Sequence, residues 1–243
     1  MKNWFTKWFD SKYYHILYKN RDQTEAKKFL KNLTKLEFFK KNMKIIDIAC
    51  GKGRHSLFLS NLGYDVTGID LSKNSIKYAE KFEKENLKFH VFDMKKTYSK
   101  NSFDVALNIF TSIGYFEKEE DDIDAIKAIS SNLKKKGILI IDFMNCEKTI
   151  NNLVKNELKT INGVTFKIKR FVKDNFIYKN IQFTDNGSDF EFTEKVKVLK
   201  LSDFRKLLRF ANMKIIDILG DYNLNKFNPK NSERLIIISR KWN

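Results

Sequence analysis

Residues 45–72 read IIDIACGKGRHSLFLSNLGYDVTGIDLS, and this stretch decides the fold. An apolar strand carries Asp47 and leads into the loop Gly51-Lys52-Gly53. A helix and a second strand follow, and Asp70 stands at the end of that strand. Ligands of open α/β sheets bind outside the carboxyl ends of the strands. We therefore expect the loop and both carboxylates to face one crevice.

The alternation of short apolar strands and helices continues along the chain. Such strands, with helices between them, predict a parallel sheet covered on both faces, finished by a hairpin-like pair. Ser72 is the predicted N-cap of the third helix. The expected strands are Ile45–Ala49, Asp65–Ile69, Leu87–Phe92, Phe103–Ile109, the apolar run Gly137–Phe143, Lys214–Leu219 and Leu235–Ser239; the expected helices are Thr24–Lys41, Gly53–Leu62, Lys73–Glu85, Asp121–Leu133 and Ser202–Ala211.

Between the fifth strand and the last helix, apolar residues alternate with polar ones instead of forming continuous apolar runs. The runs 164–172, 176–184 and 190–199 resemble antiparallel strands, and Asn186-Gly187 is a hairpin turn signal. We predict a small inserted β lobe over 158–199, a core of 20–157 and 200–243, and an aromatic N-terminal lid segment over 1–19.

Composition narrows the function classes. The net charge is +17, yet 40 of the 47 basic residues are lysine, whereas phosphate and base readers favour arginine. The charge is therefore either codon bias or a functional basic surface, and nucleic acid is a disfavoured partner. Two cysteines, Cys50 and Cys146, favour a reduced, cytoplasmic setting. No apolar run approaches the roughly 20 residues that span a bilayer, and no Cys/His spacing predicts a metal site.

The crevice does not suit a dinucleotide. The fingerprint G-x-G-x-x-G/A requires Gly or Ala where this chain has Ser56, and Asp47 would repel a pyrophosphate. A carboxylate at Asp47 suits a cationic ammonium group instead, and Asp70 can accept both hydroxyls of a ribose. These features predict a nucleoside with a charged amino-acid tail.

These motifs resemble those of class I S-adenosylmethionine-dependent methyltransferases. The resemblance covers about Thr24 to the C-terminus and is closest to the glycine and sarcosine N-methyltransferase-like branch, which carries a β insertion after strand five. It implies a Rossmann-like, seven-stranded, mostly parallel sheet with an antiparallel last strand, plus an inserted antiparallel β lobe. The matching positions are Asp47-x-Ala49-Cys50-Gly51-x-Gly53 with Arg54-His55-Ser56, Gly68–Ser72, Phe92-Asp93-Met94, Asn108 with Ser112 and Gly114-Tyr115, and the terminal strands around Ile215 and Ile236.

The resemblance also implies a cofactor, S-adenosylmethionine (SAM), and a product, S-adenosylhomocysteine. Asp47 would meet the methionine ammonium, directly or through water, unless it only caps the next helix. Ala49, Gly51 and Gly53 would pass beneath the cofactor. The remaining implied roles are ribose binding by Asp70, adenine contacts by Leu71, Asp93 and Met94, a place near the methionine for Asn108, and methionine carboxylate binding by Arg21, for which Arg54 is the competitor.

The most favoured function is in-line methyl transfer to a small-molecule acceptor. An RNA methyltransferase is the alternative, and a non-catalytic cofactor-binding protein is the third reading. Nitrogen, oxygen and carbon acceptors all stay open, as do the need for a general base and the choice between monomer and homodimer. Tyr14, His55, Tyr115 and Tyr178 are the candidate catalytic residues, and His55 has packing at the helix start as its alternative role.

Overall fold

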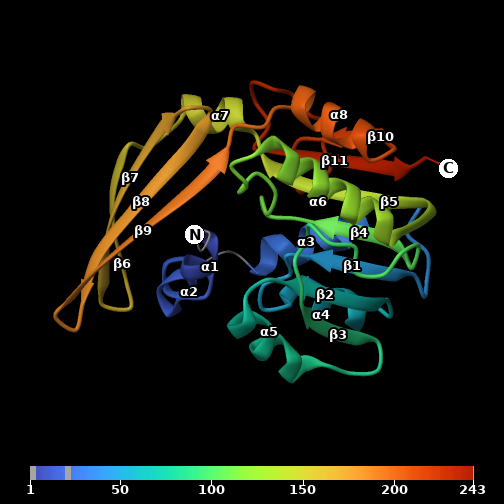
Figure 1. The fold of residues 1–243 in the computed structure, drawn as a ribbon, viewed down its shortest axis with the longest axis horizontal. Helices are drawn as coiled ribbons and strands as arrows, with labels where there is room; N and C mark the ends of the chain where they lie inside the picture. The colour runs from blue at the N-terminus through green and yellow to red at the C-terminus, as the bar shows by residue number, and fades with distance from the viewer. Residues whose placement is uncertain (1–3, 20–22, 243) are drawn as a thin grey trace.

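A computed structural model describes residues 4–19 and 23–242, and its main body is a seven-stranded sheet (Figure 1). The strand order is β10-β11-β5-β4-β1-β2-β3. These strands are β1 (Lys44–Ile48), β2 (Asp65–Asp70), β3 (Leu87–Val91), β4 (Phe103–Asn108), β5 (Leu133–Met144), β10 (Met213–Leu219) and β11 (Arg234–Lys241).

The direction of the strands confirms the expected fold class. β1 to β5 pair in parallel, whereas β11 runs antiparallel to both β5 and β10. The last strand of the chain is thus the antiparallel one. Strand order reverses between β1 and β4, which places the expected ligand crevice at the carboxyl ends of these two strands.

Helices cover both faces of this sheet because successive strand residues point to opposite sides. On one face Ile45 and Val105 pack with α3 (Gln23–Leu33), α4 (Arg54–Asn61) and α5 (Lys73–Ala79). On the other face Ile46 and Ala106 pack with α6 (Glu119–Asn132) and α8 (Leu201–Phe210).

A second, antiparallel sheet of four strands lies between β5 and β10 in the sequence. Asn186 and Gly187 join two of its strands with φ values of 49° and 75°, the left-handed pair of a tight hairpin. This sheet spans residues 156–197, whereas the predicted lobe spans 158–199, so the prediction misses the first two residues of the sheet. Its strands are β6 (Asn156–Ile161), β7 (Val164–Lys173), β8 (Phe176–Asp185) and β9 (Ser188–Lys197).

The N-terminal strap (residues 4–19) consists of α1 (Trp4–Phe9) and α2 (Lys12–Leu17), which pack on the second sheet. Figure 1 shows the strap between that sheet and the main body. Trp8 is fully buried, and its Nε1 donates to Glu194 Oε1 at 2.7 Å. The Tyr13 hydroxyl donates to Asp185 at 2.8 Å.

Some predicted element ends are wrong. The helix expected to reach Lys41 ends at Leu33, although Leu36 and Phe39 still pack on the core from turns. The helix expected to reach Glu85 ends at Ala79 and continues as a 3₁₀ turn, η1 (Glu80–Phe82). The run Gly137–Phe143 is not wholly apolar, because it contains the buried Asp142. The short helix α7 (Cys146–Asn151) was not predicted.

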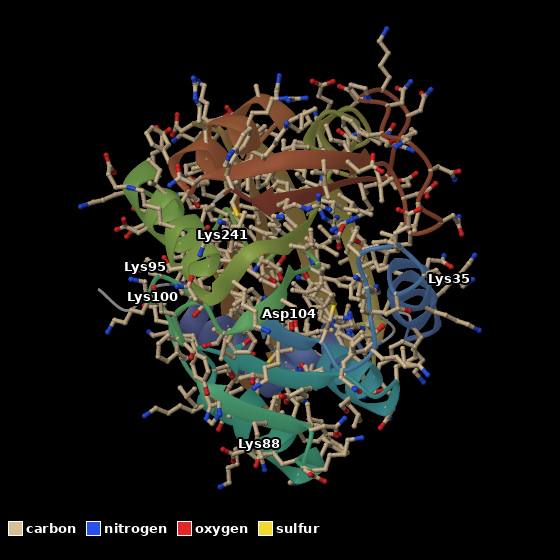
Figure 2. All side chains as sticks on the ribbon, turned by 90° about the vertical axis from the view of Figure 1, so that its right-hand side faces the viewer. Lys35, Lys88, Lys95, Lys100, Asp104 and Lys241 are labelled. Atoms are coloured by element: carbon tan, nitrogen blue, oxygen red, sulfur yellow. The ribbon has the colours of Figure 1, made fainter. Side chains whose placement is uncertain are left out.

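Lysines are spread around the sheet. In Figure 2, Lys35, Lys88 and Lys100 project from different edges of the molecule. Within the described residues, no helix combines the length and the apolar character needed to cross a membrane.

Candidate functional site

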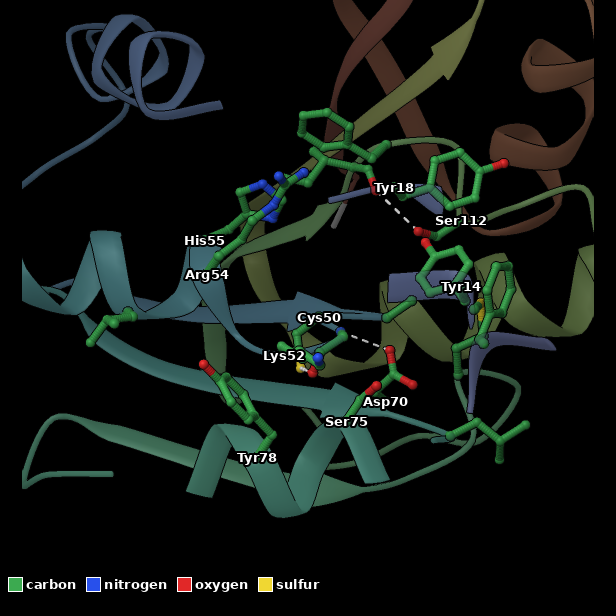
Figure 3. A pocket seen from close by; sticks show the side chains of 18 of the residues that line it. Tyr14, Tyr18, Cys50, Lys52, Arg54, His55, Asp70, Ser75, Tyr78 and Ser112 are labelled. Atoms are coloured by element: carbon green, nitrogen blue, oxygen red, sulfur yellow. Dashed lines mark hydrogen bonds between the residues drawn. The ribbon is translucent and has the colours of Figure 1, made fainter. Parts of the chain in front are cut away.

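A cavity of about 770 Å³ lies where the carboxyl ends of β1, β2 and β4 face the N-terminal strap. Sites for small molecules typically measure about 300–1,000 Å³. Its lining combines the glycine loop with many aromatic rings (Figure 3). From the strap come Phe5, Phe9, Tyr14, His15 and Tyr18; from the main body come Ala49, Gly51, Lys52, Arg54, His55, Asp70, Leu71, Tyr78, Asp93, Met94, Phe110, Ser112, Tyr115 and Phe116, among others.

The glycine loop forms the floor of this cavity. Gly51 has φ of 56°, and a Cβ built there would meet nothing within 4 Å, so open space lies beside it. Gly53 has φ of 75°, and its Cβ would come within 2.4 Å of the Phe89 ring. Both positions need glycine, the first because of its backbone conformation and the second also because of its packing. Ala49 also has a positive φ, of 60°, and lines the cavity.

Asp70 lies at the end of β2 and is held by backbone groups. Its Oδ2 accepts from the Gly51 N–H and its Oδ1 accepts from the Ser72 N–H, each at 2.8 Å. Burial raises the pKa of Asp70, although these hydrogen bonds lower it in part. Each carboxylate oxygen keeps a second lone pair, so Asp70 can accept two hydroxyl groups from a ligand in the cavity.

Asp47 lies behind the loop and does not line the cavity. It is 1% exposed, and the Ser56 hydroxyl donates to its Oδ2 at 2.6 Å. Burial raises the pKa of Asp47 to about 7, with a further contribution from the charge of Asp70. Asp47 also bonds the backbone of Ser56, the third residue of α4, and this bond fits the capping alternative. Contact with a ligand ammonium would pass through water or through the space beside the loop.

Leu71, Asp93 and Met94 line the same part of the cavity. Leu71 is 39% exposed, an apolar surface without protein covering it. Asp93 Oδ1 accepts from the Lys95 N–H at 2.9 Å, which holds the carboxylate in place. The cavity thus has an exposed apolar side chain and a fixed carboxylate among these residues, and their adenine contacts stay a prediction.

Asn108 is fully buried at the end of β4 and does not line the cavity directly. Its Nδ2 donates to the Ile48 carbonyl at 3.3 Å, whereas its Oδ1 has no partner among the described residues. An orphaned buried acceptor is costly unless a ligand or water satisfies it. Together with the open face of Gly51 and the spare lone pairs of Asp70, this orphan acceptor fits SAM.

Three of the four candidate catalytic residues reach the cavity. Tyr14 and Tyr115 line it among the aromatic rings of the strap. His55 is 7% exposed, its Nε2 has no partner among the described residues, and burial holds its pKa well below the usual range, so its imidazole is neutral. Tyr178 stacks on Phe171 in the second sheet, with ring centroids 4.9 Å apart, and does not line the cavity.

Of the two arginines predicted near the methionine carboxylate, Arg54 lines the cavity with its guanidinium 4.6 Å from the Phe110 ring centroid. Arg21 lies outside the described residues.

Sequence reasoning missed His15 and Asp10. Burial, aided by the charge of Lys52, lowers the pKa of the cavity-lining His15 to about 4, so this ring is neutral at pH 7. Asp10 Oδ1 accepts from the Ser72 hydroxyl at 2.7 Å and from the Asn74 N–H at 3.1 Å. No motif signals either residue, because each acts through a contact distant in sequence. Over 4–19 and 23–242, no cluster of three His, Cys, Asp or Glu residues could hold a metal ion.

Comparisons with known proteins agree with this geometry. A family model described as "Methyltransferase domain" matches residues 39–212. The putative methyltransferase YqeM of Bacillus subtilis is 24% identical over 208 residues, which cover 82% of this chain and 84% of that protein.

Two solved structures share the fold. A SAM-dependent methyltransferase from Clostridium acetobutylicum superposes with a TM-score of 0.80 at 20% identity, covering 95% of this chain and 96% of the other. A SAM-bound amino pentose methyltransferase from Micromonospora echinaspora gives a TM-score of 0.69 at 15% identity, covering 95% and 97%.

Proposed function

Since this chain belongs to the SAM-dependent methyltransferase family, we propose that it methylates a small-molecule acceptor held between the N-terminal strap and the glycine loop. The cavity carries this proposal. Its aromatic half is made by Phe5, Phe9, Tyr14 and Tyr115, above a donor half centred on Asp70. A segment that covers the donor crevice suits an acceptor small enough to be enclosed.

SAM supplies a methyl group already activated on a sulfonium, so the protein mainly aligns the two reactants and excludes water. In this proposal Asp70 binds the ribose hydroxyls, and Leu71, Asp93 and Met94 bind the adenine. Ala49, Gly51 and Gly53 lie beneath the cofactor. Asp47 and Asn108 stabilise the ammonium end, and Arg54 binds the methionine carboxylate.

The acceptor half orients the nucleophile. Aromatic rings there also favour the positive charge of the sulfonium. The lowered pKa values of His55 and His15 make both of them weak bases, so proton removal is not assigned to either. Tyr14 and Tyr115 contribute the acceptor wall. No catalytic role is proposed for Tyr178, because its ring lies away from the cavity.

The strap favours a small molecule over RNA as the methyl acceptor. A nucleotide within an RNA would have to pass α1 and α2, which are fixed to Glu194 and Asp185 of the second sheet. We further propose a cytoplasmic protein, for which the unpaired Cys50 and Cys146 give support. Monomer and homodimer both remain compatible with this site.

The test uses cells that lack this protein and so accumulate its unmethylated acceptor. Purified protein and methyl-tritiated SAM are added to the small-molecule fraction and, separately, to the RNA of such cells. We expect label in the small-molecule fraction, and none with Asp70→Asn, which keeps the shape of the ribose site but removes its charge. Label confined to RNA would establish the alternative function.

A further inference from the structure

Two consecutive residues after β4 adopt a left-handed backbone conformation. Phe110 has φ of 63° and Thr111 has φ of 60°, and neither is glycine. Residues with a Cβ disfavour this region, a β-branched residue most of all, so the surroundings must hold the turn. Phe110 and Ser112 both line the cavity, which means that the shape of this turn sets part of the cavity wall.

Asp142 holds the turn from behind. It is fully buried near the end of β5 and does not line the cavity. Its Oδ2 accepts from the Phe110 N–H at 2.9 Å, and its backbone carbonyl accepts from the Thr111 N–H at 2.9 Å. One residue thus binds both N–H groups of the left-handed pair. The Tyr222 hydroxyl adds a third bond to Asp142, at 3.1 Å.

Arg234 of β11 ties the same turn to the sheet. Its Nε donates to Asp142 Oδ1 at 2.7 Å and its Nη2 donates to Thr111 Oγ1 at 3.0 Å. Thr111 Oγ1 also accepts from the Met144 N–H at 3.1 Å. Only the planar fork of arginine can reach a carboxylate and a hydroxyl in this way, since lysine presents a single nitrogen.

The Phe110–Thr111 turn supports a layer of stacked side chains at the cavity. The Phe110 ring stacks on His55, with centroids 5.1 Å apart and planes 12° apart, and the Arg54 guanidinium lies 4.6 Å from its centroid. In Figure 3, Arg54 and His55 extend from the same end of α4. A shift of Phe110 would move this layer.

We propose that Asp142 and Arg234 are positioning residues for methyl transfer, which hold the Phe110–Thr111 turn and through it the acceptor-side wall of the cavity. The proposal rests on the proposed function, because Tyr115, which that function assigns to the acceptor, lies in the same cavity-lining segment as Phe110 and Ser112. Neither residue touches the cavity, so their effect passes through the turn.

The experiment compares Asp142→Asn and Arg234→Lys with a control, Ser130→Ala. Ser130 makes a buried hydrogen bond to the Ala211 carbonyl at 2.8 Å, between α6 and α8 and away from the cavity. Three measurements are made: amide hydrogen exchange of residues 108–116 without ligand, S-adenosylhomocysteine affinity by calorimetry, and the rate of tritium transfer from SAM into the small-molecule fraction described above.

For Asp142→Asn we expect at least tenfold faster exchange at Phe110 and Thr111 and at least a tenfold lower kcat. The KM for SAM and the S-adenosylhomocysteine affinity should stay within about threefold of the parent, a small loss because Arg54 packs on Phe110. Arg234→Lys, which keeps one contact and is the milder change, should fall between Asp142→Asn and the parent. Ser130→Ala should lower the melting temperature but leave kcat and the exchange of the turn unchanged.

Unchanged exchange and unchanged kcat in Asp142→Asn would overturn the proposal. So would a loss of S-adenosylhomocysteine affinity as large as the loss of kcat, because the effect would then be general rather than directed to the wall. If Asp142→Asn does not fold, Arg234→Lys and Tyr222→Phe decide by the same criteria. If the parent protein labels no small molecule, the proposed function fails, and the exchange data still decide whether Asp142 holds the turn.

Discussion

Replacing the buried carboxyl of Asp47 by an amide should stabilise the protein in a pH-dependent way. Burial raises the pKa of Asp47 to about 7, against 3.8 as its ordinary value. The unfolded chain therefore ionises this group first, and the folded state loses stability as pH rises from about 4 to about 7. A difference of about three pKa units corresponds to about 4 kcal/mol above pH 7.

About half of this loss of stability has already occurred at pH 5.5, because the unfolded chain ionises from about pH 4 while the folded chain stays protonated. The other half falls between pH 5.5 and pH 8.0. Urea unfolding of the parent and of Asp47→Asn at both pH values measures it. The amide keeps the acceptor for the Ser56 hydroxyl, so the stability advantage of the variant should grow by about 2 kcal/mol across the window. Titrating groups that do not interact with Asp47 cancel in this comparison, whereas Asp70, whose charge contributes to the raised pKa, adds a smaller difference.

The same variant should bind SAM more weakly, about tenfold, because it lacks the negative charge that favours the ammonium group. An advantage in unfolding free energy that is equal at pH 5.5 and pH 8.0 would refute the raised pKa. Unchanged SAM affinity would refute the role of Asp47 in the donor site.

Three further predictions follow from described contacts. Asp70→Ala should abolish SAM binding measurable by calorimetry while circular dichroism shows an intact fold; unchanged affinity would remove Asp70 from the ribose site. Asp10→Ala removes the carboxylate that accepts hydrogen bonds from Ser72 and Asn74. Proteolysis of the N-terminal strap should become faster, while the urea midpoint of the core stays unchanged. Equal cleavage rates would show that these two bonds do not hold the strap. Trp8→Ala removes a fully buried ring. If the strap unfolds together with the core, the free energy of unfolding should fall by about 3–5 kcal/mol. If the strap detaches first, the free energy of global unfolding should hardly change, and only this result supports a lid.

The position of the residues proposed to bind the donor could be predicted from the sequence because they lie in short, local motifs. Asp47 lies near the end of β1, Gly51 lies in the loop after it, and Asp70 is the last residue of the neighbouring β2, so their proximity follows from the fold. Periodicity likewise predicted every strand of the main sheet. Helix ends were less accurate, since the apolar spacing of Leu36 and Phe39 persists in turns that still pack on the core.

The acceptor half could not be predicted in the same way. Asp142 stands inside a run that otherwise reads as a buried strand, and its partner Arg234 is 92 residues further along. His55 stands in a sequence motif, but its lowered pKa comes from burial and from the charge of Arg54, and burial depends on the packed structure. The six-residue α7 is too short to show a helical period. These features depend on contacts between distant segments.

The bond from Ser72 to Asp10 joins the loop beside Asp70 to the strap that covers the cavity. In the proposed function, donor binding that stabilises this loop also stabilises the strap in place, and by reciprocity the strap in place raises the donor affinity by the same factor. We then expect the donor to enter before the acceptor, and opening of the strap, rather than bond making, to limit turnover.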